Sequence, residues 1–262
     1  VGILGGTGSA KSSLTQLISR LYDVTEGEVL VGGEDVRKYD IQALRDQVAV
    51  VLQKNILFSG TVAENLRWGN PNASQAELEE ACRLSQAAEF IERMKEGYES
   101  HVEQGGSNFS GGQKQRVAIA RALATKPEVL ICDEATSALD PKTTEQILEL
   151  LKKINREMGV TIILITHQMS VIEAICDEVA IIDHSRSAEA GPVKEVFRSP
   201  KSEIGRKLIL GEGEKETRFG TGKRIRLVFD GRSAHEPVIS EMILSAKAPV
   251  NILFANTKDV DN

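Results

Sequence analysis

The sequence predicts an α/β fold with a mostly parallel sheet and an inserted helical segment. Short apolar runs of strand length alternate along the chain with segments whose apolar residues recur at the helical spacing. A glycine-rich turn, Gly5–Ser13, stands between the first expected strand and the first expected helix. Because strands that alternate with helices pair side by side, this order is typical of a parallel sheet covered by helices.

The composition is that of an ordinary globular protein. The 262 residues are 41% apolar and 27% charged, and the formal net charge is −6. Proteins that bind nucleic acid usually carry a basic patch, so we expect no nucleic-acid partner. No apolar run approaches the roughly 20 residues that span a bilayer. The cysteines, Cys82, Cys132 and Cys176, lack zinc-ligand spacing and are expected to be buried thiols.

The first half of the chain opens on an apolar strand, Val1–Leu4. Because the chain begins inside this strand, we expect an upstream part with further N-terminal strands to be missing. Apolar residues at helical spacing over 14–21 predict the first helix. The next expected elements are a strand with a turn over 27–36, a strand over Val48–Leu52, and helices over 60–98 with a capping box of Ser74 and Glu77.

The second half continues the alternation. Asp140 followed by Pro141 predicts the start of a long helix, and Gly159 suits its end. The strands expected around this helix are Val129–Cys132, Val160–Ile165 and Val179–Ile182. Residues 199–222 are charged and contain glycines, so we expect a linker there. In 223–262, alternating apolar residues on both sides of a short helix that opens at Pro237 predict a small β-α-β unit.

The stretch Gly5–Ser13, "GGTGSAKSS", has the composition and the strand-to-helix context of a phosphate-binding loop. Backbone N–H groups and the helix dipole hold phosphate in such a loop. Lys11 would reach the β- and γ-phosphates, and Ser12 would bind Mg²⁺. Ala10 replaces the usual glycine before the lysine, which is tolerated if the backbone angles allow a methyl group. The alternative is a glycine-rich turn with a solvated lysine.

Polar residues follow several expected strands. Asp133 and Glu134 end a buried strand, where ligands bind in open parallel sheets. One carboxylate can support Mg²⁺, and the next can deprotonate an attacking water. Gln53 and His167 follow other apolar strands in the same way. Taken singly, each also has an ordinary interpretation as a solvated or structural strand-end residue.

A second glycine-bearing helix start lies at Ser110–Gln113. Ser110 and Gln113 form a capping box ahead of an apolar helical pattern. Two glycines in a first helical turn cost roughly 1 kcal/mol each relative to alanine. We therefore expect another group to approach this backbone closely.

In this order, these motifs resemble those of the ATP-binding cassette (ABC) ATPases over about residues 1–200. The resemblance implies a P-loop NTPase (RecA-like) fold over residues 1–198, with a helical subdomain at about 60–122. It also implies ATP and Mg²⁺ as cofactors and a head-to-tail dimer of cassettes. In that family the Ser-Gly-Gly-Gln tip binds the γ-phosphate held by the other subunit, which accounts for its glycines.

The resemblance also assigns a role to each residue. Glu134 is the expected catalytic base, Gln53 senses metal and water, and His167 contacts the γ-phosphate. The residues expected to hold Mg²⁺ are Ser12, Gln53 and Asp133. The residues expected to bind nucleotide are Gly5, Gly6, Thr7, Gly8, Ser9, Ala10, Lys11, Ser12 and Ser13, with Ser110, Gly111, Gly112, Gln113 and Asp140 acting across the dimer.

Two branches of the family are represented in one chain. Residues 51–71 and 102–112 resemble exporter cassettes, which are normally fused to a membrane domain. From about Val117 onward the chain is similar to the ATPase subunits of methionine importers, and 223–262 resembles the first half of their ferredoxin-like regulatory domain. One hypothesis is therefore a chimera joined near 110–116, and the alternative is a divergent natural cassette. A single long DNA read through this junction would distinguish the two.

The implied function is that of the ATP-hydrolysing subunit of a transporter, driving transmembrane subunits or a membrane domain from the cytoplasmic face of the plasma membrane. The C-terminal half favours methionine import. The alternatives are an exporter motor and a chimeric fragment with weak or no ATPase activity. A non-transport cassette of DNA repair or translation would carry a long coiled coil, zinc-hook cysteines or two cassettes. A GTPase would need an Asn-Lys-x-Asp tetrapeptide, and the sequence contains none of these features.

Overall fold

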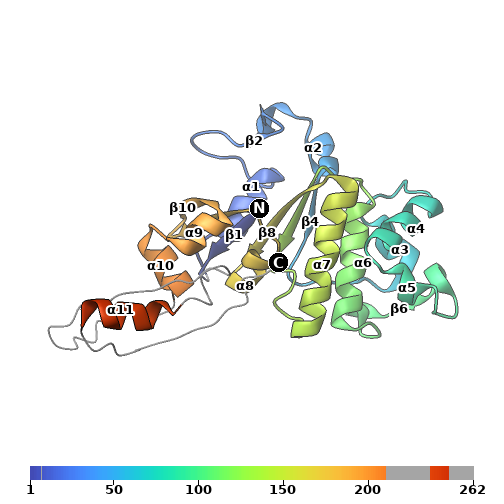
Figure 1. Ribbon diagram of the computed structural model, residues 1–262. Helices are drawn as coiled ribbons and strands as arrows, with labels where there is room; N and C mark the ends of the chain where they lie inside the picture. Colours follow the sequence, from blue (N-terminus) through green and yellow to red (C-terminus); the bar gives the residue numbers. More distant parts are fainter. Residues whose placement is uncertain (7, 211–236, 248–262) are drawn as a thin grey trace. The chain divides into compact units, whose positions relative to one another are not determined.

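The computed structural model describes residues 1–6, 8–210 and 237–247, and the chain divides into two units, Val1–Glu214 and Lys215–Asn262. The first unit is built on a six-stranded sheet with the order β10-β9-β1-β8-β7-β4 (Figure 1). Its strands are β1 (Gly2–Gly5), β4 (Val48–Val51), β7 (Val129–Asp133), β8 (Thr161–Thr166), β9 (Glu178–Asp183) and β10 (Arg186–Pro192).

Five of these strands, β9, β1, β8, β7 and β4, pair in parallel, which confirms the predicted mostly parallel sheet. Each of the five lies within one residue of the strand expected from the sequence. The edge strand β10 pairs antiparallel with β9 and was not expected. Its residues are mostly exposed and lack the apolar alternation by which the other strands were identified.

Both faces of the sheet are covered, as a parallel sheet requires. Ile3 packs on the face covered by α1 and α2, and its neighbour Leu4 packs on the opposite face with α8 and α9. The helices around the sheet are α1 (Lys11–Ile18), α2 (Ile41–Gln47), α6 (Gly111–Leu123), α7 (Pro141–Met158), α8 (Met169–Ile175) and α9 (Val193–Arg198). The remaining short elements of this part are the hairpin strands β2 (Leu30–Val31) and β3 (Glu34–Asp35) and the 3-10 turn η1 (Val36–Lys38).

The ends of α7 follow from its terminal residues. Asp140 accepts a hydrogen bond from the Thr143 backbone N–H at 3.0 Å, and Pro141 takes the first helical position. Gly159 ends the helix in the left-handed conformation, with φ of 68°. Both predicted signals are confirmed.

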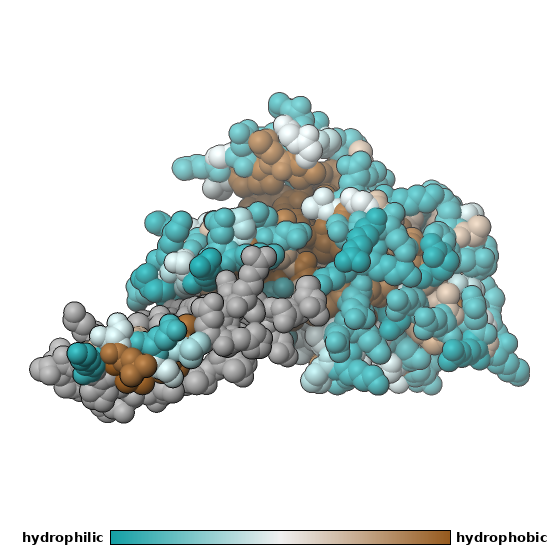
Figure 2. All heavy atoms as spheres, viewed as in Figure 1, coloured by the Kyte–Doolittle hydropathy of each residue, from teal (hydrophilic) through white to brown (hydrophobic). Residues whose placement is uncertain are grey.

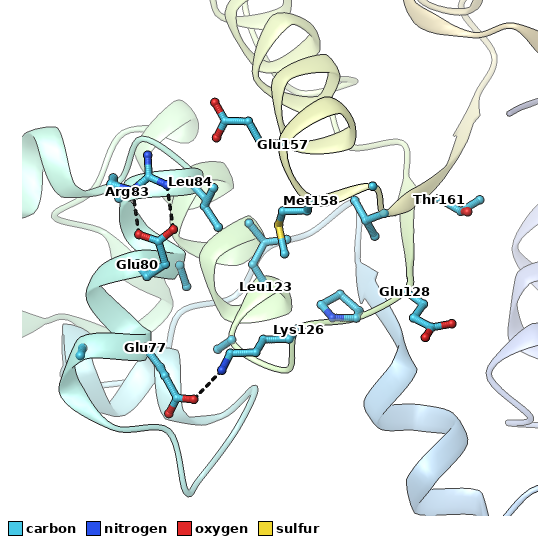
Figure 3. A pocket seen from close by; sticks show the side chains of 16 residues that line it. Glu77, Glu80, Arg83, Leu84, Leu123, Lys126, Glu128, Glu157, Met158 and Thr161 are labelled. Atoms are coloured by element: carbon cyan, nitrogen blue, oxygen red, sulfur yellow. Dashed lines mark hydrogen bonds and ion pairs between the residues drawn. The ribbon is translucent and has the colours of Figure 1, made fainter.

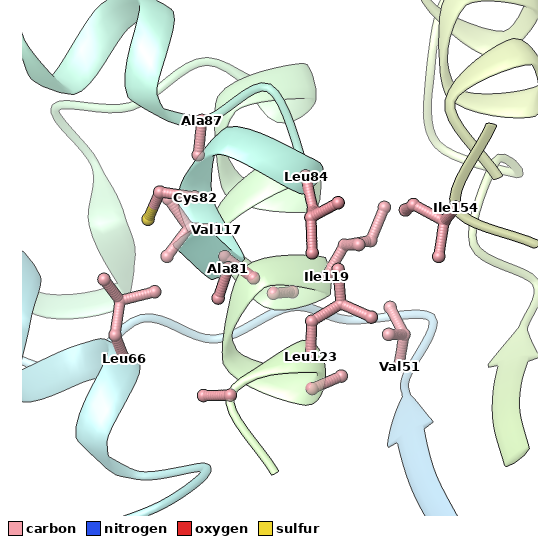
Figure 4. Close-up of a cluster of buried hydrophobic side chains, with 14 of the residues drawn as sticks. Val51, Leu66, Ala81, Cys82, Leu84, Ala87, Val117, Ile119, Leu123 and Ile154 are labelled. Atoms are coloured by element: carbon pink, nitrogen blue, oxygen red, sulfur yellow. The ribbon is translucent and has the colours of Figure 1, made fainter. Parts of the chain in front are cut away.

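A helical subdomain packs beside the sheet between β4 and β7. Its elements are β5 (Gly60–Thr61), α3 (Val62–Arg67), α4 (Gln75–Leu84), α5 (Ala88–Ile91), η2 (Gly97–Glu99), β6 (His101–Val102) and η3 (Gln104–Gly106), followed by α6. Figure 4 shows its apolar core, in which Leu66 and Cys82 lie on one side of α6 and Val51 and Ile154 on the other. Because Ile119 of α6 belongs to the same core, this helix is fixed both to the sheet and to the subdomain.

Part of the predicted linker is a packed helix. Residues Glu203–Leu210 form α10, whose Ile204 and Leu208 pack with Val179 and Ile181 of β9. The Glu189 carboxylate accepts hydrogen bonds from the backbone N–H groups that precede this helix. Residues 203–210 are therefore not a linker, because their apolar residues are spaced to bury one helical face. Residues 211–222 lie outside the described residues.

In the second unit the structure describes α11 (Val238–Ala246), which confirms the helix expected after Pro237. The strands expected on either side of it lie outside the described residues. In the first unit, Figure 2 shows mostly hydrophilic surface over α6, α7 and the helical subdomain. Among the described helices, none combines the length and the apolar character needed to cross a membrane.

The cysteines behave as expected for thiols removed from solvent. Cys82 and Cys132 are buried, and Cys176 is half-buried. Burial raises the pKa of the Cys82 and Cys132 thiols to about 12, so neither forms a reactive thiolate near neutral pH.

Candidate functional site

The phosphate loop connects β1 to α1 at the C-terminal edge of the sheet. A side chain at Gly5 would place its Cβ 2.5 Å from the Ile182 carbonyl oxygen, so only glycine fits there. Ala10, the N-cap of α1, has φ of 69° and ψ of 24°, a left-handed conformation that favours glycine. The alanine is thus accommodated at a conformational cost. Thr7 lies outside the described residues.

Lys11 is buried and its ammonium group is held by the loop itself. Its Nζ donates to the carbonyl oxygens of Gly5 at 2.9 Å and Gly6 at 2.8 Å, and to the Ser9 Oγ at 3.4 Å. At the same position α1 starts without a side-chain hydrogen bond to its first backbone N–H groups. A lysine beside open helix-start N–H groups is the arrangement that binds phosphate.

Ser12 and Asp133 meet across the site. The Ser12 Oγ donates to the Asp133 Oδ2 at 3.0 Å, because β7 delivers Asp133 to the same sheet edge as the loop. In the described part of the chain, no cluster of three or more His, Cys, Asp or Glu side chains could hold a metal. Mg²⁺ fits the hydroxyl and carboxylate oxygens present here, since it is commonly bound by one or two protein ligands together with phosphate oxygens.

Two predicted residues, Gln53 and His167, converge at Glu134. Gln53 Nε2 donates to the Glu134 Oε2 at 2.9 Å, and His167 Nδ1 lies 3.2 Å from the Glu134 Oε1. Glu134 itself has a φ of 47°, which is rare for a residue other than glycine and is found often at functional sites. Gln53 also donates to the Ser137 Oγ at 3.2 Å. No sequence signal marks Ser137 on its own, because its contact with Gln53 depends on the tertiary fold.

The tip of α6 forms a second group of predicted residues, apart from those around Glu134. Ser110 Oγ accepts from the Gln113 backbone N–H at 3.3 Å, and Gln113 Oε1 accepts from the Ser110 N–H at 2.9 Å, which confirms the predicted capping box. Together with Asp140 and Thr143, the tip lines a cavity of about 370 Å³. No described residue of the phosphate loop lines this cavity. Two groups of predicted residues therefore form two separate surfaces of one chain.

Glycine at the tip allows close packing. A Cβ at Gly112 would lie 2.8 Å from Thr143 Cγ2. The Thr143 hydroxyl and backbone N–H both donate to Asp140, and these bonds lower the pKa of the Asp140 carboxyl. Asp140 is thus a negatively charged group beside the tip.

A larger cleft, of about 850 Å³, lies at the opposite end of β7 and β8, between the helical subdomain and the sheet (Figure 3). Lys126 and Glu77 form an ion pair of 2.7 Å across its mouth. The hydrogen bond from Lys126 lowers the pKa of Glu77 to about 2. Arg83 and Glu80 pair at 2.7 Å on the same helix. No local sequence signal marks this cleft, because its walls come from segments far apart in the chain.

Comparison with known proteins identifies the family. Residues 1–137 match the ABC transporter family, and residues 223–262 match the NIL domain. The methionine import ATP-binding protein MetN of Caulobacter vibrioides is 43% identical over 258 residues, which cover 96% of this chain and 76% of that protein. MetN of Halalkalibacterium halodurans is 40% identical over 263 residues, covering 96% and 76%. Alignments of this extent cross residues 110–116, and the chimera remains a hypothesis.

A solved structure of a bacterial Atm1-family ABC exporter with ATP bound is also similar. It superposes with a TM-score of 0.68 at 37% identity, over 75% of this chain and 34% of the exporter chain. The expected likeness to both importers and exporters is therefore confirmed. Given the family match, the relatives and the α/β fold, the chain belongs to the ABC transporter family and is one of its ATP-hydrolysing subunits.

Proposed function

We propose that this chain powers a methionine importer, and that two copies form a head-to-tail dimer with shared ATP sites. The proposed dimer is supported by the separation of the two surfaces. The phosphate loop, Asp133 and Glu134 form one, and the Ser110–Gln113 tip forms the other with Asp140. A tip that lies apart from the phosphate loop of its own chain can complete the ATP site of a second copy related by two-fold symmetry.

The residues of the first surface suit hydrolysis of the γ-phosphate. Lys11 and the loop N–H groups would hold the phosphates, and Ser12, Gln53 and Asp133 would hold Mg²⁺, which neutralises phosphate charge when bound. Glu134 accepts a proton from the attacking water as the water oxygen bonds to the γ-phosphorus and the bond to the ADP oxygen breaks. Gln53 and His167 orient the Glu134 carboxylate through their hydrogen bonds.

Methionine as the substrate rests on similarity. The relatives reported above are named for methionine import, and the NIL match covers the C-terminal residues 223–262. A second candidate, an exporter motor, is favoured by the 37% identity to the Atm1-family structure. Uptake of labelled methionine in a bacterial strain that lacks its own methionine-import ATPase distinguishes them. We expect the full chain to restore uptake, and an exporter motor would not.

The proposed transmembrane partner would contact the surface around the end of α6, which would hold the chain at the cytoplasmic face of the membrane. Ile56, Phe58 and Trp68 are exposed there, and the Phe58 and Trp68 rings stack at 4.7 Å between centroids. Large exposed apolar side chains that cluster in this way often mark interaction sites. The cleft in Figure 3 borders the same helix end and offers room for a segment of a partner.

Replacing Glu134 with Gln in the full chain tests the catalytic assignment. Loss of a general base costs about 10²–10⁴-fold in rate, so hydrolysis is expected to fall by at least 100-fold. ATP binding is expected to persist and to trap a dimer, measured by size-exclusion chromatography in Mg²⁺-ATP. Glu145→Gln, on the exposed side of α7, is the matched control and is expected to hydrolyse ATP normally. Retained turnover, or a variant that remains monomeric with ATP bound, would contradict the proposal.

A further inference from the structure

The loop that carries Gln53 is held by the same helix whose tip carries Ser110. Residues 52–59 connect β4 to β5 without regular structure. Asn55 Nδ2 donates a hydrogen bond to the Gln115 Oε1 of α6, and Arg121, further along α6, donates to the Ile56 carbonyl oxygen at 3.2 Å. The loop is therefore attached to the catalytic centre through Gln53, to α6 through Asn55 and Ile56, and to α3 through the hydrogen bonds between Phe58 and Asn65.

Gln115 is a polar side chain in an apolar helix face. It is only 4% exposed, and Ala118 and Ile119, three and four residues further along the same side of α6, belong to the large apolar core. Its Oε1 bonds to Asn55, but its Nε2 is buried with no hydrogen-bond partner. A buried amide group without a partner destabilises the fold by about 1–3 kcal/mol, so a leucine of similar size would cost less. What the amide adds in this position is its bond to the loop.

The positions of the two partners place this bond between both surfaces described above. Gln115 lies two residues beyond Gln113, in the first turns of α6. Asn55 lies two residues beyond Gln53, whose amide bonds to Glu134. Because the tip and Gln115 belong to one hydrogen-bonded helix, a displacement of the tip moves Gln115 with it.

We propose that Gln115 is a positioning residue for Gln53, linking the α6 tip to the Glu134 carboxylate through Asn55. The tip would contact the nucleotide of the partner subunit, so the bond would make the state of one ATP site affect the geometry of the other. This inference rests on the proposed dimer and on Glu134 as the base. Gln115 itself contacts neither nucleotide nor the reacting atoms.

The test uses steady-state ATP hydrolysis by the full chain, with the ATP and Mg²⁺ concentrations varied separately. Gln115→Leu removes the hydrogen bond at nearly constant volume. We expect kcat to fall about tenfold, equivalent to about 1.4 kcal/mol, with KM for ATP changed less than about twofold. The Mg²⁺ concentration for half-maximal rate is expected to rise, and the cooperativity in ATP to fall. Gln75→Leu, which removes an exposed amide bond to Glu79, is the matched control.

Two further experiments test the inference, and the first of them does not require that Gln115→Leu folds. The swap Asn55→Gln with Gln115→Asn keeps the total length of the pair and is expected to recover most of the rate lost by either single change. In a Gln53→Ala background, Gln115→Leu is expected to have no further effect on kcat, because it acts through Gln53.

Three results would overturn the proposal. The first is that Gln53→Ala and Gln115→Leu lower kcat independently, so that their effects multiply in the double variant. The others are a swap that does not recover activity, and a Gln115→Leu variant that changes thermal stability but not kcat. Failure of the proposed function is recognised separately, because the chain would then show no hydrolysis dependent on Glu134.

Discussion

The starts of α1 and α6 are two helix N-termini built in opposite ways. At α1, the N-cap is Ala10 in a left-handed conformation, with no side-chain hydrogen bond to the first turn. At α6, the N-cap is Ser110 in an extended conformation, with a complete capping box to Gln113. The first helix thus presents open N–H groups beside Lys11, whereas at the second helix the Ser110 and Gln113 N–H groups are already satisfied by side chains of the same turn.

This difference suggests a division of labour between the two ends. The open start of α1 has the N–H groups and the cation to bind phosphate strongly. The capped start of α6 is stable without a ligand, so it can be presented on the surface until a second copy arrives. Substitutions at each helix start test this difference.

Lys11→Ala is expected to have the largest effect. Loss of a hydrogen bond to a charged group costs about 1.5–3 kcal/mol, so ATP affinity is expected to fall by about 10- to 150-fold. Lys114→Ala at the start of α6 is the control, since Lys114 Nζ donates a hydrogen bond to the Gly105 carbonyl oxygen at 2.9 Å. Isothermal titration calorimetry with ATP measures the affinity of both variants. Equal losses for the two variants would remove the distinction between the helix starts.

Ser110→Ala is expected to lower stability and hydrolysis together. Loss of an N-cap costs about 0.5–2 kcal/mol, and each kcal/mol shifts Tm by about 2–4 °C in a chain of this size. Ser74→Ala removes the equivalent capping box of α4 and provides the matched control. We expect similar losses of Tm from both variants, but reduced ATP hydrolysis only from Ser110→Ala. If both variants hydrolyse ATP equally well, the α6 tip has no role beyond its cap.

Ala10→Gly is expected to give the smallest effect and one of opposite sign. Glycine relieves the left-handed strain of about 1–2 kcal/mol but increases the entropy of the unfolded chain, so a net gain of about 0.5 kcal/mol is expected. Ala76→Gly, in a regular turn of α4, is expected to lose about 0.5–1 kcal/mol. Chemical denaturation compares the two. A destabilised Ala10→Gly variant would mean that the loop does not hold this conformation in solution.

The periodicities of the sequence determined most of the elements. Five strands, the capping boxes of Ser74 and Ser110, and both ends of α7 follow from residues that are close together in the chain. Such signals act within a few residues, so they remain visible without the fold. The edge strand β10 and the helices α2, α8, α9 and α10 were not predicted. Strand β10 has no apolar alternation, and the short apolar pattern of α10 is embedded in a charged, glycine-bearing segment.

The sequence alone predicts which residues carry chemistry, because phosphate loops and strand-end carboxylates have local signatures. The tertiary structure decided which of them meet. Gln53 and Glu134 are 81 residues apart in the chain and Asn55 and Gln115 are 60 apart, so no local spacing predicts either contact. The separation of the α6 tip from the phosphate loop and the left-handed angles of Ala10 and Glu134 were likewise decided there. These features depend on how the sheet and helices pack, which brings distant backbone segments together and fixes their angles.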